Sequence, residues 1–290
     1  MRPKLDFFGQ VDRAAKTPPD ALARPTHASK HTSVKFRRHG EPASGFERAG
    51  RLLRDGKPMA AIAILEHGDL LTWWVPSMIL YAEALRLVGE RDVSRSWFKR
   101  ATKRDPRNAE AWYGLGLLSA QADRDEAIRC YRRALRSDSR LGAAHRELGF
   151  LFWRQGRTLA AEGELRLAIK INPRDPWARN YYGHLLHCRG LLRRAEAAFR
   201  YALAIWKQRA HFHTALADCL LDQGRNSEAR SSFRRALVLE PENKVANRQY
   251  GLALLRLGDK KRARPYLERT LAQDPRDHRA IEALALVNAH

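Results

Sequence analysis

Small and bulky side chains recur along the chain with a long period. The small residues are separated by steps of 34 residues, with one step of 33: Ala82, Gly116, Gly149, Gly183, Ala217, Gly251 and Ala285. A bulky residue follows at Phe98, Tyr131, Leu165, Phe199, Phe233 and Leu267, and three places later a small one at Ala101, Ala134, Ala168, Ala202 and Ala236. Spacings of three and four place side chains on one face of a helix. The pattern therefore predicts a helical repeat.

Each repeat is predicted to contain two helices joined by a tight turn. Glycines stand at the turn positions, where they can adopt the left-handed backbone conformation that ends a helix: Gly89, Gly156, Gly190, Gly224 and Gly258. Prolines follow the second helix and prevent it from continuing: Pro106, Pro173, Pro241 and Pro275. In the repeat that is one residue short, Asp123 and Arg124 replace the turn glycine.

This pattern resembles the tetratricopeptide repeat family, and one repeat carries the best match to its motif, at Trp112, Leu115, Gly116, Ala127, Tyr131 and Ala134. The resemblance implies an all-α fold, a right-handed superhelical solenoid of stacked helix pairs. Residues 75–277 are predicted to form six repeat units, residues 42–74 a degenerate N-terminal unit, and residues 278–290 a C-terminal capping helix. Since one pair cannot bury its apolar face alone, stability is expected to come from stacking.

Residues 1–41 do not follow the repeat. They contain nine basic and four acidic residues and several prolines, which predicts a disordered basic tail. Within it, Leu5, Phe7, Phe8 and Val11 form a short apolar island. The island is interpreted either as unstructured chain without a role, as a docking peptide, or as a segment that folds back onto the repeats.

Positive charge is in large excess, with 54 basic and 32 acidic side chains and a formal net charge of +22. Part of it recurs at the repeat period on the predicted second helices, and we call these residues the basic stripe: Lys99, Arg100, Arg132, Arg133, Arg166, Arg200, Arg234, Arg235 and Arg269. Such a stripe is either ordinary solvent-exposed surface or a surface that attracts polyanions. It makes nucleic acid the alternative partner, and it also favours an acidic protein.

No combination of residues predicts catalysis. The sequence has no paired nucleophile and base and no phosphate-binding glycine loop, so we expect neither enzymatic activity nor a cofactor. The best candidates for metal ligands are His184, His187, Cys188, His211 and His213, on two neighbouring first helices. His184 and His187 are predicted to lie about 10 to 15 Å further along their helix than His211 does along its own, so no shared metal is expected.

No apolar run has the length of about 20 residues that a membrane-spanning helix needs. The first residues contain no apolar stretch of signal-peptide length either. A cytoplasmic location is therefore predicted.

The family resemblance implies that a partner binds in a groove lined by the first helix of each repeat. Carried over to this sequence, the implied groove residues are Tyr113, Arg146, Phe150, Trp153, Arg154, Trp177, Asn180, His184, His187 and His211. Aromatic rings beside arginine and asparagine are typical of binding hot spots; the alternative is that Phe150 and Trp153 only pack between helices. The predicted function is a non-catalytic scaffold or adaptor that holds a partner's peptide, with no small-molecule substrate. The oligomeric state stays open.

Overall fold

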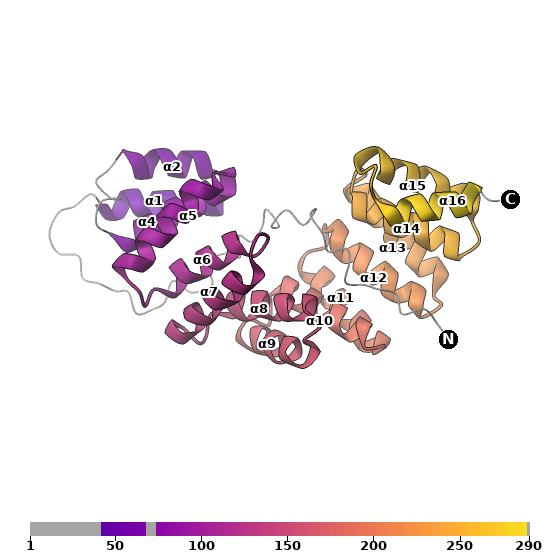
Figure 1. Ribbon diagram of the computed structural model, residues 1–290, viewed down its shortest axis with the longest axis horizontal. Coiled ribbons are helices and arrows are strands. Elements are labelled where there is room, and N and C mark those ends of the chain that lie inside the picture. Colours follow the sequence, from indigo (N-terminus) through magenta and orange to yellow (C-terminus); the bar gives the residue numbers. More distant parts are fainter. Residues whose placement is uncertain (1–41, 68–73, 289–290) are drawn as a thin grey trace. The chain divides into compact units, whose positions relative to one another are not determined.

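The computed structural model describes residues 42–67 and 74–288, and all regular elements in these ranges are α-helices. They are α1 (Pro42–Arg54), α2 (Pro58–Glu66), α4 (Val75–Val88), α5 (Arg91–Arg104), α6 (Ala109–Ser119), α7 (Arg124–Ser137), α8 (Gly142–Arg154), α9 (Thr158–Ile171), α10 (Pro176–Cys188), α11 (Leu192–Ile205), α12 (Ala210–Asp222), α13 (Asn226–Leu239), α14 (Lys244–Arg256), α15 (Lys260–Gln273) and α16 (His278–Asn288). Consecutive helices form antiparallel pairs (Figure 1). The prediction of an all-α fold of stacked helix pairs is confirmed, whereas the predicted tail at residues 1–41 lies outside the described residues.

The described chain divides into two compact units, and the division falls within α8, after Leu151. The N-terminal unit contains the pairs α1 and α2, α4 and α5, and α6 and α7, together with most of α8. The C-terminal unit begins at Phe152 and contains the end of α8, α9, three further pairs and α16.

The turns within the pairs follow the predicted chemistry. All five predicted turn glycines have positive φ angles, between 74° at Gly156 and 94° at Gly89. Gly56, between α1 and α2, adopts the same conformation at φ 72°, although it was not predicted to. In the short repeat, the Asp123 side chain instead caps α7 by accepting a hydrogen bond from the Glu126 backbone N–H at 2.9 Å.

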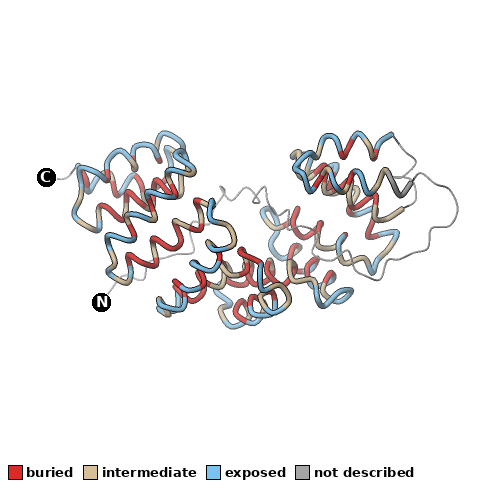
Figure 2. Tube along the Cα trace, turned by 180° about the vertical axis from the view of Figure 1, so that it is seen from behind, coloured by how far each residue is buried: buried red, intermediate tan, exposed pale blue. Residues whose placement is uncertain are grey.

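The core of each pair is a ring or leucine on the second helix packed against a small residue on the first. The six bulky repeat residues are between 0 and 1% exposed. At the α10 and α11 pair, a Cβ atom placed on Gly183 would lie 2.6 Å from the Phe199 ring, so the ring rests directly on the first helix's backbone. Burying such a side chain contributes about 1.5–3 kcal/mol. Buried positions accordingly recur along every pair (Figure 2).

Each pair also packs on the next one within its unit. In the C-terminal unit, α11 contacts α12, α13 contacts α14, and the first helices α12 and α14 contact each other. The lone helix α16 covers the last pair, where Ala280, Ala283 and Val287 are buried. Stacking therefore covers the apolar face that a single pair leaves open. None of the described helices is long and apolar enough to cross a membrane.

The contact between Gly183 and Phe199 leads to a stability prediction with a matched control. We expect Gly183→Ala to lower the stability by about 1–3 kcal/mol, because the new methyl group would overpack a buried ring. Gly163 is exposed on α9, and a Cβ atom added there would have nothing within 4 Å, so Gly163→Ala should stabilise by about 0.5–1 kcal/mol. Thermal unfolding followed by circular dichroism measures both, and equal shifts for the two variants would contradict the packing argument.

Candidate functional site

The residues predicted to line the groove lie on first helices in both units. Tyr113 on α6 and Arg146 and Phe150 on α8 belong to the N-terminal unit. The others belong to the C-terminal unit: Trp153, Arg154, Trp177, Asn180, His184, His187 and His211. Most of this second group comes together around α10 and the start of α12, so the candidate site is described in the C-terminal unit.

Four rings meet there, and we call them the ring cluster: Trp153, Trp177, His184 and His211. The Trp153 and His184 rings stack with centroids 5.5 Å apart, and the Trp177 and His211 centroids are 5.7 Å apart. His184 and His211 join the two halves at 5.8 Å. Trp153 is 6% exposed, whereas the other three rings are partly accessible. The ring cluster therefore consists of one buried tryptophan and three partly accessible rings, two of them imidazoles.

The predicted separation of His184 from His211 is wrong. That prediction counted only the rise along two helices taken as parallel and level with each other. The structure instead brings the start of α12 beside the middle of α10, and long side chains on a helix lean toward its N-terminus. Proximity alone makes no metal site, since the described residues contain no group of three or more His, Cys, Asp or Glu side chains placed to hold a metal ion.

The imidazoles of the ring cluster are neutral at neutral pH. Burial lowers the pKa of His184 well below its ordinary value, and the neighbouring His211 and His187 lower it further. Burial also lowers the pKa of His211 to about 4. A neutral imidazole has one donor and one acceptor nitrogen, so these rings can hydrogen-bond to either kind of group.

Asn180 lies fully buried beside the ring cluster. Its Nδ2 is 3.3 Å from Nε2 of His211. Its carbonyl oxygen has no hydrogen-bond partner within the described ranges. Because buried polar groups are normally satisfied, this oxygen is an unused acceptor in the wall of the site.

A row of polar contacts crosses the first helices next to the ring cluster. Nε2 of His187 on α10 lies 2.9 Å from Asp222 on α12, and Asp222 also pairs with Arg256 on α14 at 2.6 Å. The hydrogen bond from His187 and the contact with Arg256 lower the pKa of Asp222. One turn earlier on α12, burial and then the charge of Asp222 raise the pKa of Asp218 to about 8, so Asp218 is largely protonated at neutral pH.

The arginines of the first helices are mostly neutralised by acidic neighbours. Arg248 pairs with Asp277 at 2.7 Å, and both side chains are buried. In the N-terminal unit, Arg146 pairs with Glu147 at 2.8 Å and reaches the Tyr113 hydroxyl at 3.4 Å, with its side chain only 4% exposed. Arg146 is therefore not available as a free cation, and its burial favours a packing role.

Most residues of the basic stripe likewise contact other residues of the chain. Arg166 and Arg200 pair with Glu162 and Glu196, one helical turn earlier, at 2.9 and 2.8 Å. These ion pairs were not predicted from the sequence, although the two glutamates recur 34 residues apart and each lies four residues before its arginine.

Other stripe residues contact their own helix pair. The Arg100 and Arg133 guanidinium groups lie over the rings of Trp97 and Trp112, 5.0 and 4.5 Å from the centroids. Arg269 donates a hydrogen bond to the side-chain oxygen Oδ1 of Asn247 at 3.3 Å. Arg234 on α13 donates a hydrogen bond to the backbone carbonyl oxygen of Arg230 at 3.4 Å. The remaining stripe residues are exposed: Lys99 on α5, Arg132 on α7 and Arg235 on α13. Much of the stripe thus holds the second helices in place.

The pairing of the first-helix charges was not predicted from the sequence either. His187 and Asp222 are 35 residues apart, one more than the repeat, and Asp222 and Arg256 are 34 apart, which is one repeat. Opposite charges at one repeat's separation on first helices were the signal that could have revealed the row.

Comparison with known proteins gives one family. A family model described as tetratricopeptide repeat matches residues 81–124, 117–176 and 189–244, and a second model with the same description matches residues 220–287. No curated protein is significantly similar in sequence to this chain.

Solved structures share the fold. A chain of the APC/C hetero-tetramer Cut9-Hcn1 is 19% identical with a TM-score of 0.76, and the match covers 84% of this chain and 48% of that one, so this chain spans about half of its length. A tetratricopeptide repeat protein from Parabacteroides merdae is 15% identical with a TM-score of 0.61, covering 85% of this chain and 98% of that one. The Pseudomonas aeruginosa protein pilF is 19% identical with a TM-score of 0.61, covering 73% and 96%. At these identities the similarity concerns the fold alone.

The two aspartates of α12 should have opposite effects on stability as the pH changes. An Asp218 carboxyl ordinarily titrates near 3.8, and in the folded chain near 8, so between these values the unfolded chain binds fewer protons and stability falls as the pH rises. We therefore expect Asp218→Asn to raise Tm relative to the native chain at pH 8 and to have little effect at pH 4. Asp222→Asn should lower Tm at pH 7, and less so in acid, because the folded state favours the charged form of Asp222. If Asp218→Asn changed Tm by the same amount at pH 4 and pH 8, the raised pKa of Asp218 would be refuted.

The three cysteines should differ sharply in reactivity. Cys188 is exposed near the ring cluster, whereas Cys130 and Cys219 are buried and burial raises their pKa values to about 12 and about 11. In a titration with Ellman's reagent we expect one thiol to react in the folded chain and three after denaturation. Cys188→Ser should remove the fast thiol. A fast thiol in the folded Cys188→Ser chain would contradict the packing of α7 and α12.

Proposed function

Because this chain belongs to the tetratricopeptide repeat family, we propose that it is a non-catalytic scaffold that binds a peptide segment of a partner protein. Proteins of this family generally mediate protein–protein interactions, and the fold is typically non-catalytic. The proposal places the binding surface on the first helices of the C-terminal unit, around the ring cluster. It includes the division into six repeats at 75–277, a degenerate unit at 42–74 and a capping helix at 278–290, and it keeps the predicted cytoplasmic location.

The observation that carries the proposal is the ring cluster with its two neutral, partly accessible imidazoles. A peptide backbone presents both N–H and C=O groups, and neutral imidazoles can pair with either. The partly accessible Trp177 ring beside His211 supplies apolar area for a side chain of the peptide. Burying a neutral group on binding costs less desolvation free energy than burying a free charge does. The neutral imidazoles therefore favour contact with an uncharged stretch of peptide.

The preference for an acidic partner follows from the charge of the whole chain and not from the ring cluster. A net charge of +22 raises the rate at which an acidic protein meets this one. Arg248 and Arg256 already pair with Asp277 and Asp222, so a partner's carboxylates would have to displace existing ion pairs to bind them. We therefore assign acidity to the regions of the partner that flank the bound segment.

Nucleic acid binding is less well supported. Arg166 and Arg200 are held by glutamates, and the Arg100 and Arg133 side chains are stacked on rings of their own pair. Phosphate groups would have to compete with these contacts. The net charge still permits weak, salt-sensitive association with polyanions.

Two histidines on α12 provide the test. His211 belongs to the ring cluster, whereas His213, two residues away, bonds to the Lys207 carbonyl oxygen at 3.0 Å and lies outside it. Peptides are first selected from a random display library with the full chain, and their affinities are then measured for His211→Ala and His213→Ala. We expect about tenfold weaker binding for His211→Ala, equivalent to about 1.4 kcal/mol, and no change for His213→Ala.

Thermal unfolding of both variants confirms that they are folded. Equal affinities of the two variants, or loss of binding only in His213→Ala, would reject the ring cluster as the binding surface.

A further inference from the structure

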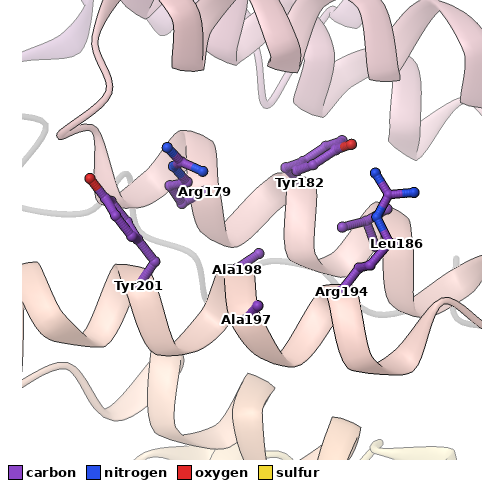
Figure 3. Close-up of a pocket in the computed structure, with 7 residues that line it drawn as sticks. All are labelled: Arg179, Tyr182, Leu186, Arg194, Ala197, Ala198 and Tyr201. Atoms are coloured by element: carbon purple, nitrogen blue, oxygen red, sulfur yellow. The ribbon is translucent and has the colours of Figure 1, made fainter.

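A hollow of about 320 Å³ lies between α10 and α11, on the side of α10 opposite the ring cluster. Its lining is Arg179, Tyr182, Leu186, Arg194, Ala197, Ala198 and Tyr201. The α10 residues 179, 182 and 186 share one helix face, as do the α11 residues 194, 197, 198 and 201. The helices are antiparallel, so Arg179 lies beside Tyr201 at one end and Arg194 near Leu186 at the other (Figure 3).

A ring that two other pairs carry at the equivalent place is missing from this one. In the α4 and α5 pair, Tyr81 contacts Trp97 sixteen residues later, with centroids 5.3 Å apart. In the α14 and α15 pair, Tyr250 contacts Tyr266 at the same spacing and 4.7 Å. Tyr182 is the equivalent tyrosine of the α10 and α11 pair, but the residue sixteen places later is Ala198. The space next to Tyr182 therefore lies where those two pairs hold a second ring.

Cationic groups stand at both ends of the hollow. The Arg179 guanidinium lies over the Tyr201 ring at 4.3 Å, and its Nε is buried without a hydrogen-bond partner in the described chain. Neither Arg179 nor Arg194 pairs with a carboxylate of residues 42–67 or 74–288. An occupant that fits would combine an aromatic side chain with acidic groups on either side.

The chain itself contains such a segment, and we propose that residues 5–12 dock in the hollow between α10 and α11. This segment reads Leu-Asp-Phe-Phe-Gly-Gln-Val-Asp, with the aromatic pair Phe7 and Phe8 between Asp6 and Asp12. One phenylalanine ring takes the place of the missing ring beside Tyr182. The two carboxylates pair with the guanidinium groups at the ends of the hollow. This assignment is independent of the ring cluster and of what binds there.

The two aspartates are far enough apart in the chain to span the hollow. Arg179 and Leu186 are seven residues apart, which gives the hollow a length of about 10 Å along α10. Asp6 and Asp12 are six residues apart, or about 9 Å along a helix and about 20 Å along a strand. The linker to α1, residues 13–41, spans up to about 95 Å when extended.

The test uses the full chain with the photoreactive residue p-benzoylphenylalanine in place of Phe8. After irradiation, cross-linked peptides are mapped by mass spectrometry. We expect cross-links within one chain to the peptides of α10 and α11. Ala198→Tyr fills the hollow as Tyr266 does in the last pair, and it should reduce their yield at least tenfold. Val238→Tyr adds the same ring at an exposed position on α13, and it should leave the yield unchanged.

Charge exchange tests the ionic contacts separately and does not require Ala198→Tyr to fold. Asp6→Arg with Asp12→Arg should lower the yield, as should Arg179→Asp with Arg194→Asp, and the four substitutions together should restore it. Cross-links outside α10 and α11, cross-links between two copies of the chain, or a yield that neither the filled hollow nor the charge exchange alters would each overturn the proposal.

Discussion

The structure depends on one repeated contact, in which a bulky side chain of each second helix rests against a small residue of the first helix. Phe199 on Gly183 and Tyr131 on Gly116 leave no room for a Cβ atom between ring and backbone. That closeness lets two short helices bury a whole ring, and it sets the distance between them. The pair still exposes an apolar side, which the next pair or the final helix α16 covers. The period in the sequence and the stacking of the fold are two consequences of this one contact.

The same repetition organises the charges. A carboxylate and an arginine one repeat apart face each other across neighbouring first helices, as Asp222 and Arg256 do. Within second helices, Glu162 and Glu196 hold the arginine one turn later. A large excess of positive charge is therefore compatible with a first-helix surface whose cations are mostly paired. In the proposed function, net charge attracts partners at a distance, whereas recognition at contact depends on the few neutral and aromatic groups left accessible.

Local departures from the repeat create the two surfaces of interest. At the start of α12, His211 and its neighbours place imidazoles against tryptophans, and burial keeps them uncharged. On the other face of α10, Ala198 stands where two other pairs carry a ring, and a hollow lies beside it. Because a stacked repeat tolerates changes at positions outside its central contact, such surfaces vary without loss of the fold.

The sequence alone determined the helix pairs, the turn glycines and the buried ring positions, because each follows from spacing along a single helix or a single turn. It also indicated which first-helix residues share a face. Only the tertiary structure decided that His184 meets His211, that Arg146 is buried against Glu147, and that the α10 and α11 pair contains a hollow. These depend on how far one helix is shifted and tilted against another and on which side chains fill the space between them. The spacing of residues along one helix does not determine the angle at which two helices cross or the shift between them.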